Sequence, residues 1–383
     1  MASPTHCLPL VDGAVAARAA APDLARGLAL ALIALANVMI YLHARAYGPR
    51  QHIVEENPLD LGVTALLVTW VDSRAYPLFA ALFGYGMVRI ADRVRSAGDE
   101  RGAASALRRR SWWLIGFGAV HAALAFSGDV LGWYGLIGVV LASRTRLRGS
   151  ALLWLAAAWL LVASAVQGAV YADPTVTDQR SFLWSFAIED PGAALGWRLL
   201  EWLMTPFGLL SVVSAVLVGM WAAHRRVLER PCEYLILLRV TAFVGISAGV
   251  LGGIPMAVVT IQLWKPSSLV VGALSWLHIL TGVLAGLGYL AAITLLARRW
   301  RDGRIARALR ATGERSLSAY LAQTVVFGAL LPAHTLGLGA VLGTTQAAAL
   351  ALLTWLATVV GAAMLAGSGR RGPAEALLRR CAR

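Results

Sequence analysis

The chain has 383 residues, of which 58% are hydrophobic and only 14% charged, with a formal net charge of +14. Soluble globular chains carry about a quarter charged residues, so this composition excludes a protein made only of soluble domains. The basic residues are spread over six short segments without a folded reading domain, which also argues against nucleic acid as a partner. The composition instead predicts the lipid bilayer as partner.

Three cysteines, Cys7, Cys232 and Cys381, fall in segments that we expect on the cytoplasmic side. This placement argues against a disulfide framework and against a structural metal site. The Ala-rich stretch 8–22 is a poor signal peptide because Asp12 and Arg18 interrupt it. We therefore expect the first apolar span to serve as an uncleaved anchor.

Ten apolar stretches approach the length of about 20 residues that a helix needs to cross a bilayer. They lie at 27–43, 63–88 (broken near Pro77), 111–127, 130–143, 150–171, 203–223, 235–262, 268–297, 316–333 and 344–367. We predict an all-α, polytopic integral membrane protein of the cell membrane with about ten transmembrane helices. Its predicted parts are a cytoplasmic segment 1–26, a single transmembrane domain 27–367 and a basic cytoplasmic tail 368–383.

The distribution of basic residues predicts the orientation. Lys and Arg collect in cytoplasmic loops of membrane proteins. With the N-terminus inside, 27 of the 34 basic residues fall on the cytoplasmic side, whereas the acidic residues divide equally. Ten spans with both termini cytoplasmic fit every loop. Two external segments, 44–62 and 172–202, are long, and the 195–202 part of the second is expected to lie in the interface as an amphipathic helix.

Small residues mark the expected helix contacts. Gly245, Gly249 and Gly253, and likewise Gly282 and Gly286, recur at about one-turn spacing, which lets helices approach closely. The run Gly245–Gly249 also matches the Gly-x-Ser-x-Gly spacing of a nucleophile elbow, but that motif needs a strand before it. We therefore interpret it as a packing stripe. Ionisable residues at membrane depth remain as the functional candidates, since their burial is costly.

His121, near the middle of the third span, is the first candidate, with Asp129 eight positions onward. That spacing places the two side chains only loosely on one side of a helix, so a direct bond is not implied. The functional interpretation is a general base oriented by a carboxylate. The alternative is a structural histidine, with Asp129 capping the next helix.

His43 and the pair Asp72 and Arg74 are further candidates. His43 would act as a base at the external end of the first span, or lie as an interfacial residue beside Tyr41 and Tyr47. Arg74 would bind a carboxylate or phosphate of a substrate, unless Asp72 or another local carboxylate satisfies it.

Other polar residues of the spans have structural alternatives. Arg198 and Glu201, at i and i+3, are interpreted as a helical ion pair. His278 would face a central cavity or be a satisfied packing histidine. Tyr320 and Gln323 lie one turn apart on the ninth span, where they would bind substrate or bond a neighbouring helix. Ser316 is the expected N-cap of that span.

Four separated stretches resemble the YeiB-like membrane proteins, a family defined by a domain of unknown function. They are Arg26–Leu30 with Asn37; Tyr76–Gly86; Arg109-Arg110 with Gly118, His121, Gly128–Leu131 and Tyr134; and Gly313–Leu321 with Gln323. Gly372 through Arg379 is similar to the closing motif of that family, with Ala374 and Ala376 in place of larger apolar residues. Ser318-Ala319 stands where the family usually has Thr-Asn.

This resemblance implies an architecture related to multi-span membrane acyltransferases, and with it Asn37 as a further substrate contact. The first hypothesis is therefore an acyltransferase that takes acyl-CoA as co-substrate, without a metal, and transfers the acyl group to a small-molecule or lipid-linked hydroxyl or amine acceptor. The basic cytoplasmic face would attract the phosphates of acyl-CoA. A transporter with Asp129, Asp72 and His121 along its path, and a non-catalytic membrane protein, remain alternatives. The sequence leaves open whether the protein forms a homo-oligomer.

Overall fold

The computed structural model describes residues 20–147, 149–300 and 303–382. Within these ranges the chain is all-helical, and its only β contacts are two isolated bridges, from Tyr47 to Ile53 and to Thr177. The α-helices are α1 Ala20–Val38, α2 Pro58–Trp70, α3 Ala75–Ser96, α4 Gly102–Leu124, α5 Leu131–Leu141, α6 Ser150–Val170, α7 Pro191–Gly208, α8 Val212–His224, α9 Leu235–Thr260, α10 Ser268–Arg299, α11 Arg304–Glu314, α12 Ser316–Leu330, α13 Thr344–Gly367 and α14 Pro373–Cys381. Cys7, Arg18, Arg148 and most of the stretch 8–22 lie outside the described residues.

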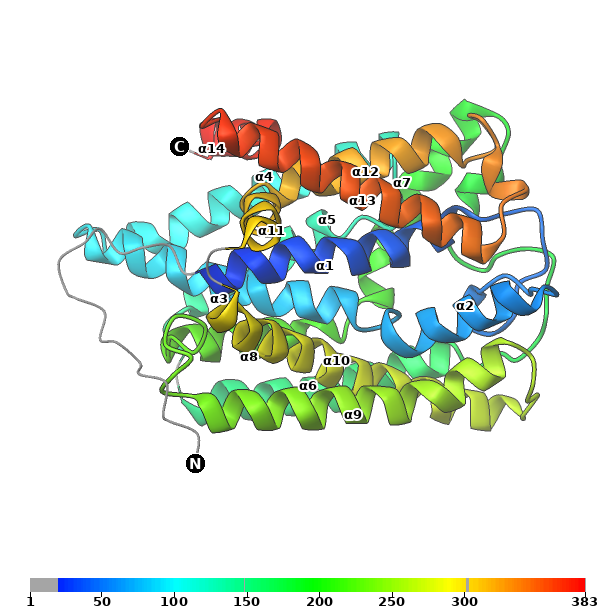
Figure 1. Cartoon of the computed structure of the whole chain (residues 1–383), viewed down its shortest axis with the longest axis horizontal. Helices are drawn as coiled ribbons and strands as arrows, with labels where there is room; N and C mark the ends of the chain where they lie inside the picture. The colour runs from blue at the N-terminus through cyan, green and yellow to red at the C-terminus, as the bar shows by residue number, and fades with distance from the viewer. Residues whose placement is uncertain (1–19, 148, 301–302, 383) are drawn as a thin grey trace.

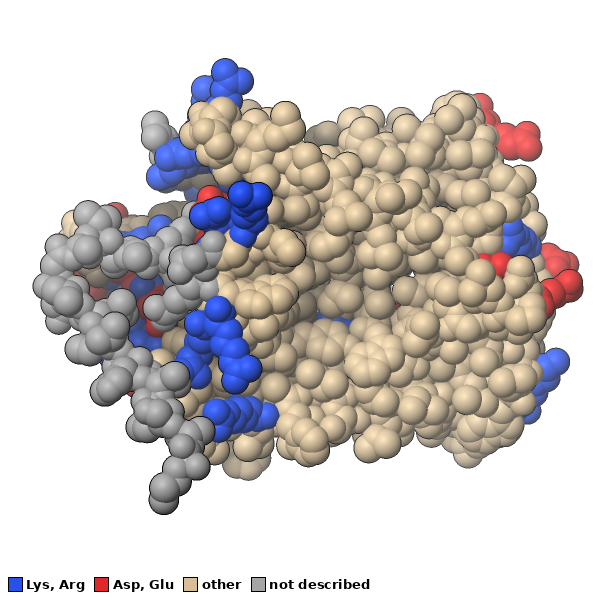
Figure 2. Space-filling model, in the orientation of Figure 1, with Lys and Arg blue, Asp and Glu red and all other residues tan. Residues whose placement is uncertain are grey.

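The helices form an elongated bundle. The first residue of α1 and the whole of α14 lie at the same end of this bundle (Figure 1). Lys and Arg side chains gather at this end, and Asp and Glu side chains mark the opposite end (Figure 2). Between them lies a broad surface almost free of charge. We call the two ends the basic end and the acidic end.

Within the described ranges, five helices are long and apolar enough to cross a membrane, as is typical of a membrane protein. The candidates are Ala20–Tyr41, Ser150–Val170, Leu235–Thr260, Ser268–Arg299 and Thr344–Gly367. The pair α7 and α8 passes the same test together but bends by 61° at the break. Two shorter apolar helices, Leu131–Arg144 and Ser316–Leu330, accompany them.

Most predicted spans have a helical counterpart, and the largest differences occur at breaks and caps. The predicted span 63–88 is two helices, interrupted at residues 71–74 and not at Pro77. Pro77 lies in the first turn of α3, where the missing N–H costs nothing. The segment 172–202 is not wholly a loop with a short interfacial helix, because α7 begins at Pro191. The Asp190 side chain accepts a hydrogen bond of 2.6 Å from the backbone of Ala193 and so caps α7.

The core centres on the contact between α3 and α8. A Cβ atom at Gly84 would overlap the carbonyl group of Val216, and one at Gly219 would overlap that of Ala81. These two helices therefore meet backbone to backbone. Side chains of α3 and α8, among them Leu78, Leu82 and Val216, lie within the largest buried cluster.

The predicted packing stripes are confirmed for Gly245 and Gly249, which lie against α10. The other glycines of the stripes pack against residues 71–74, which separate α2 from α3. Gly253 lies against the Arg74 guanidinium, Gly282 against Ser73 and Gly286 against the Arg74 carbonyl. The stripes therefore make room for a polar turn as well as for a helix.

Candidate functional site

His121 and Asp129 form a direct hydrogen bond across the turn between α4 and α5. The Nδ1 atom of His121 lies 2.8 Å from Oδ1 of Asp129, and both side chains are buried. A continuous helix would hold these side chains apart, but α4 ends at Leu124 and the turn brings Asp129 back against it. The second oxygen, Oδ2, accepts the backbone N–H of Gly132 at 2.8 Å. Asp129 thus orients the imidazole and caps α5 at once.

Thr324 of α12 completes a line of three side chains. Its Oγ1 atom lies 2.6 Å from Nε2 of His121 and is fully buried. A carboxylate only accepts hydrogen bonds, so Nδ1 of His121 donates to Asp129. The Thr324 hydroxyl also lies 3.2 and 3.1 Å from the carbonyl oxygens of Tyr320 and Leu321, which compete with Nε2 of His121 for its single proton. No pattern in the sequence singles out Thr324, because an isolated threonine on an apolar helix commonly bonds its own backbone.

Of three further predicted residues, Tyr320 lies beside this line, whereas Asn37 and Gln323 bond other residues. The ring of Tyr320 lies 5.1 Å from the His121 ring, centre to centre. Asn37 accepts a hydrogen bond of 2.6 Å from the Tyr76 hydroxyl. Gln323 donates to Thr358 of α13 at 3.3 Å, as expected for an interhelical bond. Its Oε1 atom is buried and has no hydrogen-bond partner among the described residues.

His43 lies apart from this line, near the acidic end. Its Nδ1 lies 3.1 Å from the Tyr41 carbonyl oxygen, and its backbone N–H donates to Gly339 at 3.1 Å. Tyr41 and Tyr47 are buried, so the expected interfacial group of exposed aromatic residues is not formed there. Burial lowers the pKa of His43 below its usual value of 6.5, and nearby Arg180 and Arg45 lower it further, against the opposing effect of the Tyr41 carbonyl.

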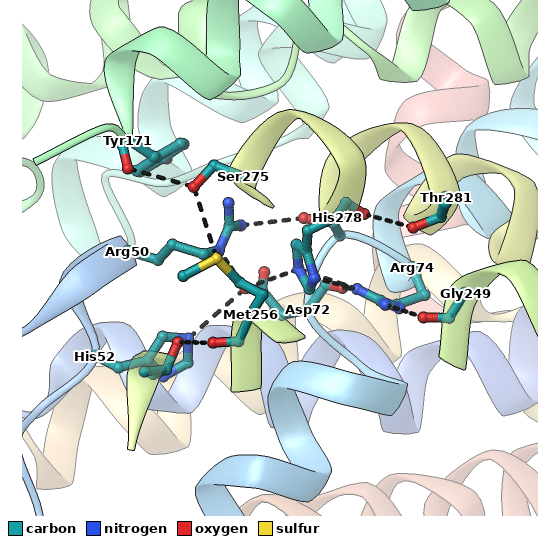
Figure 3. A network of polar contacts seen from close by, with 12 residues as sticks. Arg50, His52, Asp72, Arg74, Tyr171, Gly249, Met256, Ser275, His278 and Thr281 are labelled. Atoms are coloured by element: carbon teal, nitrogen blue, oxygen red, sulfur yellow. Dashed lines mark hydrogen bonds and ion pairs between the residues drawn. The ribbon is translucent and has the colours of Figure 1, made fainter. Parts of the chain in front are cut away.

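A second polar cluster joins Asp72, Arg74 and His278 at the break between α2 and α3 (Figure 3), with Arg74 and His278 buried and Asp72 partly exposed. Arg74 is completely buried, donates to the Gly249 carbonyl at 2.6 Å and lies 3.0 Å from Nε2 of His278. It also bonds the backbone carbonyl of Asp72, whereas the Asp72 carboxylate faces other partners. Asp72 therefore satisfies Arg74 in part, as expected, but through its backbone carbonyl and not through its carboxylate.

Arg50 and His52 supply those partners from the 39–57 loop. Arg50 Nε lies 3.0 Å from Asp72 Oδ2, and His52 Nε2 lies 3.7 Å from the same oxygen. His278 Nε2 approaches it to 3.5 Å. Arg50 and His52 lie in the predicted external segment 44–62, and their positions along the chain do not indicate a contact with Asp72.

The predicted ion pair between Arg198 and Glu201 is not present. Glu201 accepts hydrogen bonds from the backbone and hydroxyl of Ser185, at 2.8 and 2.6 Å. Arg198 points to the Ala194 carbonyl and to His334. Ser185 lies in the short 3-10 helix Trp184–Ala187 before α7, and it offers the Glu201 carboxylate two donors in place of the expected cation.

The line from Asp129 through His121 to Thr324 has the order carboxylate, imidazole, hydroxyl, in which an imidazole oriented by a carboxylate can accept a proton from a hydroxyl. Among the described residues, no group of three or more His, Cys, Asp or Glu side chains is placed to hold a metal ion.

The family match found by comparison with known proteins lies in the C-terminal part of the chain. Residues 222–383 match the family described as "Protein of unknown function (DUF418)". A Bacillus subtilis (strain 168) protein described as "Uncharacterized protein YxaH" is 28% identical over 145 residues, 36% of this chain and 36% of that protein. The match thus spans about a third of the curated relative, and no solved structure matches the chain. Residues 222–383 are therefore similar to the DUF418 family, in agreement with the YeiB-like resemblance of the sequence.

Proposed function

We propose that the chain crosses the cell membrane ten times with both ends in the cytoplasm. The pairs α2 with α3 and α7 with α8 each count as one crossing, and α1, α4, α5, α6, α9, α10, α12 and α13 supply the others. An even number agrees with α1 and α14 lying together at the basic end (Figure 1). Single cysteines in the 172–190 loop and in the tail after α13 test this: only the loop cysteine should react with an impermeant reagent in intact cells.

We propose further that this membrane protein is an acyltransferase that moves an acyl group from acyl-CoA to a hydroxyl or amine. The observation that carries the proposal is the line Asp129–His121–Thr324, with its hydrogen bonds of 2.8 and 2.6 Å. An acceptor hydroxyl that replaces the Thr324 hydroxyl at Nε2 would meet a base whose tautomer is already set.

The reaction balances with His121 as the only proton carrier. Nε2 takes the acceptor proton while the acceptor oxygen attacks the thioester carbonyl carbon. The C–S bond then breaks, the acyl group remains on the acceptor, and the imidazolium returns its proton to the coenzyme A thiolate. Asp129 stabilises the transient positive charge on the ring, which is buried with it.

The position of His121 sets the approach of the two substrates. His121 lies roughly 28 Å along α4 from its first residue, at 1.5 Å per residue, and only one turn from its last. The arginines that would attract the phosphates of acyl-CoA lie at the basic end (Figure 2). The proposed donor therefore extends along the bundle to reach the base, and the acceptor enters from the acidic end.

The test is binding and turnover of a panel of acyl-CoA thioesters by the purified protein. We expect wild-type protein to transfer or slowly hydrolyse at least one thioester, and His121→Gln to lose about 100-fold or more in turnover while still binding it. His43→Gln is the matched control and should keep wild-type turnover. No thioester binding by wild-type protein, or full turnover in His121→Gln, would exclude this mechanism.

Transport is the second candidate because the bundle contains two broken helices. Discontinuous helices near mid-depth form the substrate sites of many transporters. The α2–α3 break holds the cluster of Asp72, Arg74 and His278, of which Arg74 and His278 are buried (Figure 3). Uptake into proteoliposomes that depends on a proton gradient and disappears in Asp72→Asn would favour transport. Wild-type behaviour of His121, Asp129 and Asp72 variants in both assays would leave the non-catalytic alternative.

A further inference from the structure

A groove between α9 and α10 opens on the outer surface of the bundle toward its basic end. It is shallow and largely open, with a volume of about 340 Å³, and its lining residues are Arg239, Ala242, Phe243, Ile246, Ser247 and Leu295. Ala242 and Leu295 pack on a buried cluster that includes Leu238 and Ala291. The groove therefore has a fixed floor built by the packing of the two helices.

The groove faces the membrane. Ile236 and Phe243, on the same helix, are 79% and 75% exposed, and α9 is among the helices long and apolar enough to cross a bilayer. Exposed apolar side chains of this size at membrane depth contact acyl chains. Whatever occupies the groove thus comes from the bilayer and not from water.

Arg239 stands at the mouth of this apolar groove. It lies in the second turn of α9, is exposed, and has no hydrogen bond or ion pair among the described residues. Arg298 of α10, one turn beyond Leu295, is also unpaired within that part of the chain. Ser247 lies roughly 12 Å deeper than Arg239 along the helix. A long basic side chain at this depth extends to the level of the lipid headgroups.

We propose that this groove is a binding site for one anionic phospholipid. The guanidinium of Arg239 binds the phosphate in a forked geometry, and the first part of one acyl chain lies along Phe243, Ile246 and Leu295. Its volume is at the lower end of ligand pockets, so it holds a segment of a chain and not a whole lipid. The second cation, Arg298, gives preference to headgroups with a net negative charge over zwitterionic ones.

The test measures lipid retained by the full-length protein after delipidation and incubation with phosphatidylglycerol or phosphatidylcholine, by native mass spectrometry. We expect preferential binding of phosphatidylglycerol to wild-type protein. Arg239→Gln should weaken it about five-fold, the effect of one basic residue near an anionic surface, and Arg239→Lys should recover part of it. Arg108→Gln, which removes another exposed arginine, is the matched control and should bind as wild type.

A second variant distinguishes lipid binding in the groove from nonspecific electrostatic attraction of anionic lipid to the basic end. Ser247→Leu fills the deep part of the groove without a change of charge and should weaken binding of both lipids. Equal loss in Arg239→Gln and Arg108→Gln, or unchanged binding in Ser247→Leu, would overturn the site. Release of the lipid by millimolar inorganic phosphate would show a free-anion site in its place.

Discussion

The carboxylate of Glu375 in α14 accepts a hydrogen bond of 2.7 Å from the backbone amide of Leu317, at the start of α12. It also accepts the backbone N–H of Ser318 at 3.1 Å. Ser316, the cap expected from the sequence, is the first helical residue, and no side-chain cap precedes it. The last helix of the chain therefore caps the helix that carries Thr324, and it joins two segments of the family resemblance, 313–323 and 372–379.

Removal of this cap should destabilise the protein. We expect Glu375→Ala to lower the free energy of unfolding by about 1 kcal/mol, the usual cost of a lost N-cap, because two backbone N–H groups lose their acceptor. Thermal unfolding in detergent measures the change. Glu314→Ala, which removes a more exposed carboxylate at the same junction, should change the midpoint little; equal losses would contradict the capping role.

Asp129→Asn should separate the two roles of Asp129. The amide oxygen can still cap α5 at Gly132, so we expect little loss of stability. An amide no longer fixes the Nδ1 proton of His121 or stabilises its positive charge, so turnover of the proposed acyl transfer should fall by about 100-fold or more.

The comparison for Asp129→Asn is Asp129→Ala, which should lose the turnover and about 1 kcal/mol of stability as well. Turnover by the variant Thr324→Val tests whether the Thr324 hydroxyl takes part in the reaction. If its hydroxyl only occupies the place of the acceptor, this variant keeps most of the activity. Full turnover in Asp129→Asn would show that the hydrogen bond to His121 is structural.

Glycine at position 84 should be essential for the contact between α3 and α8. A Cβ atom there overlaps the backbone of Val216, and overpacking of this kind costs about 1–3 kcal/mol or more. We expect Gly84→Ala to lower the unfolding midpoint or to prevent assembly of a monodisperse protein.

Gly361→Ala in α13 is the control for that substitution, since nothing lies within 4 Å of its added Cβ atom. Alanine stabilises a helix interior by roughly 0.5–1 kcal/mol relative to glycine, so this variant should be as stable as wild type or more so. Similar effects of the two substitutions would contradict the close contact.

The stability of the protein should fall as the pH decreases through the range where histidine titrates. Burial lowers the pKa of both His43 and His334 below the usual 6.5, so the unfolded state binds protons that the folded state does not. The stabilisation from the neutral rings is complete above the unfolded pKa and is lost as the pH falls below it toward the lowered folded values.

Unfolding midpoints measured from pH 8 to pH 5 should therefore decrease for wild-type protein. The double variant His43→Asn, His334→Asn should show a shallower decrease, because asparagine takes up no proton in this range. An equally steep decrease in the double variant would assign the pH dependence to other groups.

The sequence was sufficient for the helical class and for a helix in most of the predicted apolar stretches, because long apolar runs favour buried helices. The roles of His121 and Asp129 stay predictions. Their contact could not be derived, since it depends on the turn after Leu124, and helical spacing places the two side chains apart. The start of α7 could have been found, because Asp190 followed by Pro191 is a common N-cap signal.

The rest of the two sites depends on contacts between distant segments. Thr324 meets His121 from a helix some 200 positions away, and Arg50 reaches Asp72 from a loop. Neither pairing leaves a local pattern of spacing or charge. The same holds for Glu375, whose role as a cap is visible only when α14 is placed beside α12.

The contact of Gly84 with Val216 also limits how the molecule can change shape. Helices whose backbones touch cannot slide or separate without opening the core, so α3 and α8 behave as one rigid axis. Their partners α2 and α7 connect to that axis through residues 71–74 and 209–211. Entry of a bulky acceptor from the acidic end would therefore proceed by tilting of these two outer segments about their joints, while the central pair stays still.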